Sequence, residues 1–92
     1  MGKKILVADD SRTMRRAFQI AFAKEDVELV LVESGDAALD KARAEVPDLV
    51  LADHRMPGKT GYEVCDAIKS DPQIGHAQVV ICCSNQDPFD AQ

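Results

Sequence analysis

The sequence predicts an α/β fold, an open parallel β-sheet with helices on both of its faces. Four short apolar segments rich in β-branched residues are separated by segments whose apolar residues recur at helical spacing. The short segments are apolar on both faces, which is typical of parallel strands buried between helix layers. Because 92 residues, 46% of them hydrophobic, can bury one modest core, we expect a single domain over residues 1–92.

The first βαβ unit begins with the apolar run at residues 5–8. A helix is then predicted over residues 11–24, with Ser11 or Asp10 as its N-cap. Its inward face is the apolar stripe of Met14, Ala17, Phe18, Ala21 and Phe22. The second strand is predicted over residues 27–32, near a sheet edge because it carries Glu28.

The second helix is predicted to open at Ser34 and Gly35 and to end at Pro47, because proline cannot continue a helix. Its predicted apolar stripe consists of Ala38, Leu39, Ala42 and Val46. A third strand follows over residues 48–53.

The third helix is predicted over residues 61–70, where Gly61 occupies a position that needs no Cβ. Its inward residues are Val64, Cys65 and Ile68. Asp71 and Pro72 stop this helix, and the fourth strand is predicted over residues 78–84.

Three carboxylates stand at the ends of two of the predicted strands. Asp9 and Asp10 follow the first strand, and Asp53 follows the third. Because the carboxyl ends of neighbouring parallel strands line one crevice, we expect a single acidic pocket. Two charges about 4 Å apart repel by roughly 4 kcal/mol at an effective dielectric near 20, so the pocket must hold a proton or a cation. Ligands that are all oxygen favour Mg²⁺ over Zn²⁺.

The segment at residues 53–61 reads Asp-His-Arg-Met-Pro-Gly-Lys-Thr-Gly. Together with Asp9, Asp10 and the hydroxyl residue Ser84, it resembles the receiver domain of bacterial two-component response regulators. The resemblance covers the whole chain. It implies the flavodoxin-like (CheY-like) fold, with strand order 2-1-3-4-5.

The resemblance also implies a role for each site residue. Asp53 would accept a phosphoryl group from a sensor histidine kinase or phosphotransfer protein, and Ser84 would bind a phosphoryl oxygen as the switch hydroxyl. Mg²⁺ would be held by Asp10 directly, by Asp9 mainly through water, and by Asp53 and the backbone carbonyl of Arg55. By the same resemblance, we expect the domain not to be an enzyme, to be cytoplasmic, and to switch an output domain or partner protein.

The sequence departs from the family pattern after Ser84. A receiver has a fifth strand bearing a lysine, an aromatic switch residue and a last helix, and we find no counterpart of these before Gln92. None of the six lysines stands at the required place: Lys3, Lys4, Lys24, Lys41, Lys59 and Lys69. We therefore expect a C-terminally incomplete receiver, either a fragment or a degenerate form. Its uncovered fourth strand should favour self-association.

Several other residues have a structural interpretation. We expect His54 and His76 to be exposed loop histidines, because no second histidine or cysteine stands at metal-ligand spacing. The three cysteines are expected to be small buried hydrophobes in a reducing compartment: Cys65, Cys82 and Cys83. The three arginines of the first helix are expected on a solvated face: Arg12, Arg15 and Arg16.

Composition excludes some classes of protein, and three hypotheses about function remain. The net charge of −5 opposes nucleic-acid binding, and the apolar run at residues 5–8 is too short to span a membrane. The leading hypothesis is a phospho-accepting receiver, and the alternative is a pseudo-receiver that binds proteins without phosphorylation. A Mg²⁺-dependent phosphotransferase resembling the haloacid dehalogenase type is disfavoured, because Arg55 stands where that type has a second aspartate.

Overall fold

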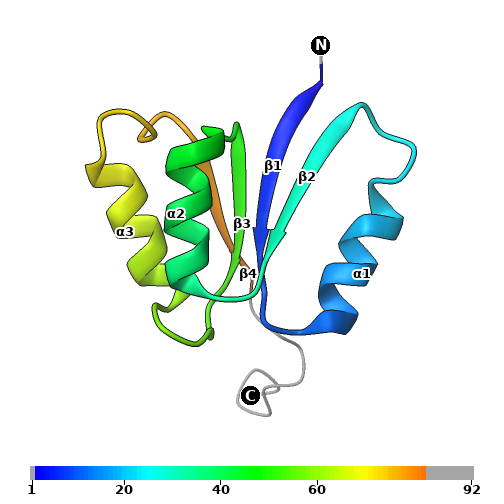
Figure 1. Cartoon of the computed structure of the whole chain (residues 1–92), viewed down its shortest axis with the longest axis horizontal. Helices are drawn as coiled ribbons and strands as arrows, with labels where there is room; N and C mark the ends of the chain where they lie inside the picture. The colour runs from blue at the N-terminus through cyan, green and yellow to red at the C-terminus, as the bar shows by residue number, and fades with distance from the viewer. Residues whose placement is uncertain (1, 83–92) are drawn as a thin grey trace.

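The computed structural model describes residues 2–82 and shows an α/β fold (Figure 1). The strands are β1 (Lys3–Ala8), β2 (Val27–Val32), β3 (Leu49–Asp53) and β4 (Gln78–Cys82). The helices are α1 (Arg12–Ala21), α2 (Gly35–Glu45) and α3 (Gly61–Ser70). Strands and helices alternate along the chain, as the sequence predicts.

All the strand pairs of the sheet are parallel, and the strand order is β2-β1-β3-β4. This order confirms the flavodoxin-like fold class and the edge position of β2. In the centre of the sheet, Ala8 of β1 pairs with Ala52 of β3, so these two strands end at the same level. The chain reverses its direction of winding between them, which makes this the end of the sheet where ligands bind in such folds.

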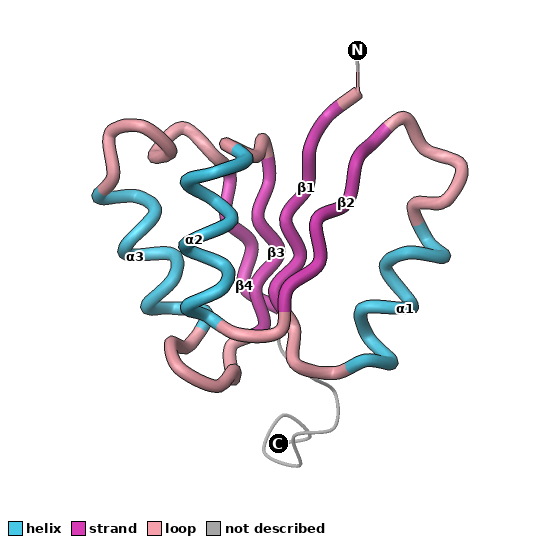
Figure 2. Tube along the Cα trace, in the orientation of Figure 1, coloured by secondary structure: helices cyan, strands magenta, loops and turns pink. Residues whose placement is uncertain are grey.

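The two faces of the sheet are covered unequally. Helices α2 and α3 lie together on one face, and α1 lies on the other (Figures 1 and 2). The core is formed between the sheet and the α2–α3 layer, and its largest fully buried members include Leu6, Val50, Val64, Ile68 and Ile74. Most of the hydrophobic free energy of the described residues therefore comes from one side of the sheet.

Helix α1 contains no buried residue. Its predicted apolar stripe is only partly used, because Phe18 is half-buried while Met14 remains 43% exposed. The helix is also shorter than the predicted 11–24, since Phe22 is already its C-cap. Ser11 is the N-cap, and its hydroxyl accepts a hydrogen bond from the Met14 amide at 3.3 Å.

The prediction for Val46 is wrong. It is the C-cap of α2 with a left-handed φ of 50°, and it is 45% exposed. The following Pro47 disfavours a helical conformation at Val46 and takes the fully buried position itself. The other members of the α2 stripe, Ala38, Leu39 and Ala42, are buried as predicted.

The cysteines are less buried than predicted. Cys65 of α3 and Cys82 of β4 are of intermediate exposure. Cys83 and the predicted end of the fourth strand lie outside the described residues. Within residues 2–82, no helix is long and apolar enough to cross a membrane.

Candidate functional site

The three acidic residues at the strand ends come together as predicted. One oxygen each from Asp9, Asp10 and Asp53 lies within 4.8 Å of the others. Asp9 is 4% exposed and Asp53 is 9% exposed, whereas Asp10 is open to solvent. The chain therefore buries two carboxylates and places a third at the surface beside them.

Hydrogen bonds fix the β1–α1 loop that carries Asp9. The Ser11 amide donates to Asp9 Oδ1 at 2.9 Å, and the Asp9 amide donates to the Val32 carbonyl at 3.1 Å. Arg15 Nη1 donates to the Asp9 carbonyl at 2.7 Å, and Arg15 Nη2 lies 4.0 Å from Glu33 Oε1. The prediction of a solvated Arg15 is thus wrong, because its side chain is only 16% exposed.

The pocket destabilises ionised carboxylates when no cation neutralises them. Burial is the main cause that raises the pKa of Asp9, and the charges of Asp53 and Asp10 raise it further. The hydrogen bond from the Ser11 amide and the charge of Arg15 lower the same pKa and offset part of this rise. Ionised Asp9 is therefore stabilised by any cation that enters the pocket.

The donor set fits a hard divalent cation. All three side chains offer oxygen, which Mg²⁺ prefers, and two of them are held by the ends of rigid strands. Oxygens on one Mg²⁺ lie at most about 4.2 Å apart, from metal–oxygen distances of about 2.1 Å. The observed cluster, within 4.8 Å, needs only a small contraction to satisfy this geometry.

The side chain of His54 lies close to the carboxylate of Asp53, a contact that is not predicted from the sequence. His54 Nδ1 lies 3.2 Å from Asp53 Oδ1, and the Arg55 amide donates to the same oxygen at 3.5 Å. The prediction of an exposed His54 is wrong, because its side chain is only 16% exposed. The signal was its position directly after the strand end, where the chain still pairs with β4: the His54 amide donates to the Cys82 carbonyl at 3.0 Å. His76 is exposed, as predicted.

The loop that follows Asp53 is held against two helices. A Cβ on Gly61 would lie 2.4 Å from the Asp53 carbonyl oxygen, which confirms that this position needs a glycine. Thr60 and Glu63 form a capping box at the start of α3. At the N-terminus of α2, the Gly35 amide donates to the Pro57 carbonyl at 3.1 Å. These contacts set the position of the loop that follows Asp53.

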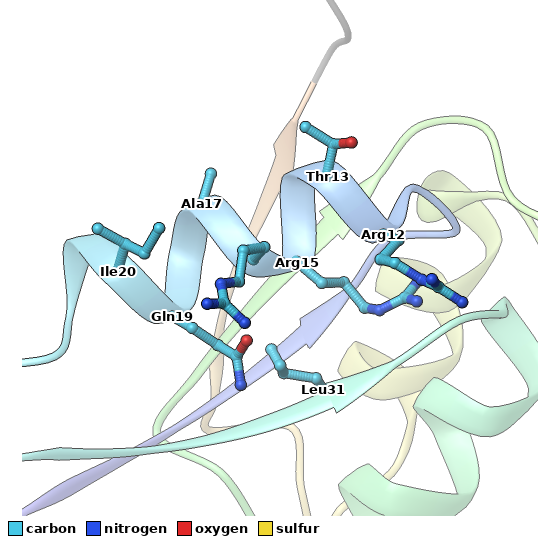
Figure 3. Close-up of a pocket in the computed structure, with 8 residues that line it drawn as sticks. Arg12, Thr13, Arg15, Ala17, Gln19, Ile20 and Leu31 are labelled. Atoms are coloured by element: carbon cyan, nitrogen blue, oxygen red, sulfur yellow. The ribbon is translucent and has the colours of Figure 1, made fainter.

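A hollow of about 570 Å³ lies between α1 and Leu31 of β2 (Figure 3). Its lining consists of Arg12, Thr13, Arg15, Arg16, Ala17, Gln19, Ile20 and Leu31. Arg12 and Arg16 are exposed, as predicted, and Arg15 connects this side of α1 to the Asp9 loop.

Two predicted site features lie beyond what the structure tests. Ser84 is outside the described residues, so its contact with a phosphoryl group stays a prediction. Arg55 is exposed, and the metal-binding role of its carbonyl also stays a prediction.

Comparison with known proteins identifies the family of the chain. The model of the family described as the response regulator receiver domain matches residues 5–92. The response regulator PleD of Caulobacter vibrioides is 36% identical over 81 residues, which are 88% of this chain and 18% of PleD. This chain therefore spans less than a fifth of that relative's length.

Solved structures share the fold. The phosphorylated cyanobacterial phytochrome response regulator RcpA is 33% identical, with a TM-score of 0.83 over 99% of this chain and 71% of RcpA. The Mn²⁺-bound response regulator Rcp1 is 29% identical, with a TM-score of 0.81 over 96% of this chain and 70% of Rcp1. The fold, the sequence match and the acidic strand ends agree, and the chain belongs to the response regulator receiver domain family.

Proposed function

We propose that this domain is a phospho-accepting receiver in two-component signalling. Asp53 accepts a phosphoryl group from a sensor histidine kinase or phosphotransfer protein, and its phosphorylation switches an output domain or partner protein. The observation that carries the proposal is the position of Asp53, a nearly buried carboxylate beside Asp9 and Asp10. The phosphorylated state of the similar RcpA supports it.

Mg²⁺ is the proposed cofactor. Asp10 and Asp53 would bind it directly, Asp9 mainly through water, and the backbone carbonyl of Arg55 would complete the share of the protein. When bound, the ion would neutralise charge on the carboxylates and on the incoming phosphoryl group. The all-oxygen cluster supports this proposal, as does the Mn²⁺ bound in the structure of Rcp1.

The transfer step follows from the hydrogen bonds of Asp53. Its Oδ1 faces His54 and accepts from the Arg55 amide, whereas Oδ2 accepts no hydrogen bond from the described residues. We therefore assign Oδ2 as the atom that attacks phosphorus. As the Oδ2–P bond forms, the P–N bond to the kinase histidine breaks, and its electron pair stays on the departing imidazole. Asp53 itself is modified, so we propose that the domain is a phosphoryl acceptor and not an enzyme.

Signalling then requires a contact that exists only in the phosphorylated state. We propose that Ser84 supplies it by donating a hydrogen bond to a phosphoryl oxygen, which biases the domain toward an active conformation. The domain would work in the cytoplasm, without direct contacts to nucleic acid or membrane. Its net charge of −5 agrees with protein partners.

Acetyl phosphate, a small phosphoryl donor, tests the proposal without the kinase. Incubation with Mg²⁺ and intact mass measurement should show one phosphoryl adduct, absent in Asp53→Ala and in EDTA. Asp66→Ala is a matched control, because Asp66 is an exposed acid on α3, and it should keep the adduct. An equal adduct in Asp53→Ala would overturn the assignment. A folded protein without any adduct would favour the pseudo-receiver instead.

A further inference from the structure

The imidazole of His54 lies beside the carboxylate of Asp53. The proposed phosphoryl transfer does not use this imidazole. Its Nδ1 is 3.2 Å from Asp53 Oδ1 and 3.4 Å from the Cys82 carbonyl oxygen. The side chain is only 16% exposed, although a loop histidine would ordinarily be solvated. The ring is therefore held inside the site.

The two neighbours of Nδ1 determine whether this ring nitrogen carries a hydrogen. A carbonyl oxygen and a carboxylate oxygen are both acceptors, so a lone pair on Nδ1 would repel both of its neighbours. Nδ1 therefore carries a hydrogen, which it donates to Cys82 while facing Asp53 Oδ1 at short range. The His54 amide also donates to the Cys82 carbonyl, at 3.0 Å. The end of β4 thus holds both the main chain and the ring of His54 in place.

We propose that the Nδ1–H group of His54 speeds the hydrolysis of phosphorylated Asp53. This inference rests on the proposed function, because it requires Asp53 to be the phosphoryl acceptor. In the hydrolysis, the oxygen of a water molecule attacks phosphorus and the bond between phosphorus and Asp53 Oδ2 breaks. The electron pair of that bond stays on the carboxylate, the water releases a proton to solvent, and inorganic phosphate leaves.

The direction of the effect follows from where charge develops. In the acyl phosphate, Oδ1 is a weakly charged carbonyl oxygen, and it regains carboxylate charge as the Oδ2–P bond breaks. The Nδ1–H dipole is shared with the Cys82 carbonyl, and its nitrogen lies 3.2 Å from Oδ1. The partial positive charge of this N–H group stabilises the growing charge on Oδ1 more than it stabilises the phosphorylated ground state. The same dipole does not assist phosphorylation, during which charge leaves the carboxylate. His54 therefore shortens the lifetime of the signal without promoting its formation.

A matched pair of amide variants tests this role. The amide nitrogen of Asn in His54→Asn can stand near the place of Nδ1, whereas His54→Gln carries its amide one methylene further from the main chain. The protein is phosphorylated with acetyl phosphate and Mg²⁺, desalted, and followed by intact mass in Mg²⁺ buffer. We expect hydrolysis about three- to tenfold slower in His54→Gln and near the parental rate in His54→Asn. His76→Gln, at an exposed histidine, should be unchanged.

The outcomes separate this inference from the proposed function. A parental protein without an adduct, or an adduct that persists in Asp53→Ala, overturns the proposed function. An adduct on Asp53 that decays equally fast in the parent and in His54→Gln overturns only the role of His54. His54→Leu should decay as slowly as His54→Gln, and circular dichroism identifies any variant that has lost its fold. The rate of either folded variant then decides the question.

Discussion

Among single residues, Asp9 shows most directly how burial changes a measurable property, its pKa. Its pKa is raised, chiefly by burial, so the folded state binds a proton more readily than the unfolded chain does. The contribution of Asp9 to stability is therefore unfavourable at neutral pH. This unfavourable contribution decreases as the pH falls through the raised pKa of Asp9 toward the ordinary value of 3.8.

We expect Asp9→Asn to increase the free energy of unfolding in EDTA at neutral pH. The Asn side-chain oxygen can still accept the hydrogen bond from the Ser11 amide. The gain should shrink as the pH is lowered toward the ordinary carboxyl value of 3.8, because the parental carboxylate takes up its proton on the way. Urea unfolding at neutral pH and at a series of lower pH values measures the difference. A variant less stable than the parent at neutral pH would show that burial of charge is not the dominant cost.

Gly61 allows a second test at the residue scale. A Cβ at this position would lie 2.4 Å from the Asp53 carbonyl oxygen, so Gly61→Ala must push the end of β3 away from α3. We expect a loss of about 1–3 kcal/mol in the free energy of unfolding and a slower reaction with acetyl phosphate. Gly2→Ala is the control, because its nearest atom would be the Asp26 side-chain oxygen at 3.0 Å. Equal effects of the two variants would contradict the role assigned to Gly61.

At the scale of elements, α1 stands apart because no residue of it is buried. Arg15 joins this helix to the Asp9 carbonyl at 2.7 Å, whereas the neighbouring Arg16 is exposed. We expect Arg15→Met to speed amide hydrogen exchange throughout α1 and to lower stability by about 1–2 kcal/mol. Arg16→Met should leave both properties unchanged. Equal exchange in the two variants would mean that the half-buried aromatic residues alone hold the helix.

The helices and strands also show which features of the structure could be predicted from the sequence. The strand order was expected only from the resemblance to receiver domains. The strands themselves and the meeting of Asp9 with Asp53 were predictable from the residues, because apolar periodicity marks the strands and parallel strands share one carboxyl edge. The burial of His54 was not, since it depends on the Cys82 carbonyl, 28 residues further along the chain. Arg15 was missed for a similar reason, because helical spacing alone does not reveal that a long side chain reaches back to the β1–α1 loop.

At the scale of the whole molecule, the described residues leave two apolar surfaces without cover. Strand β4 pairs with β3 on one side only, and its Val80 is 47% exposed. On the other face of the sheet, Met14 and Ile20 of α1 are 43% and 66% exposed. Open strand edges and apolar patches promote association between chains.

We therefore expect the chain of residues 1–92 to self-associate at low micromolar concentration, with β4 as one contact. Val80→Lys should shift light scattering toward the monomer, because a charge on an edge strand opposes pairing. Tyr62→Lys changes a side chain that is 61% exposed on α3 and is not part of β4, and it should not have this effect. A monomer in the parental protein would contradict the prediction.

The hydrogen bond from the Gly35 amide to the Pro57 carbonyl gives the domain an internal reporter. It joins the first residue of α2 to the loop that follows Asp53, the proposed phosphoryl acceptor, and it contains no side-chain atom of the site. The nuclear magnetic resonance frequency of this one amide proton depends on the length of its hydrogen bond. Phosphorylation that moves the loop by even a fraction of an ångström would therefore be visible at Gly35, in the unsubstituted protein and in real time.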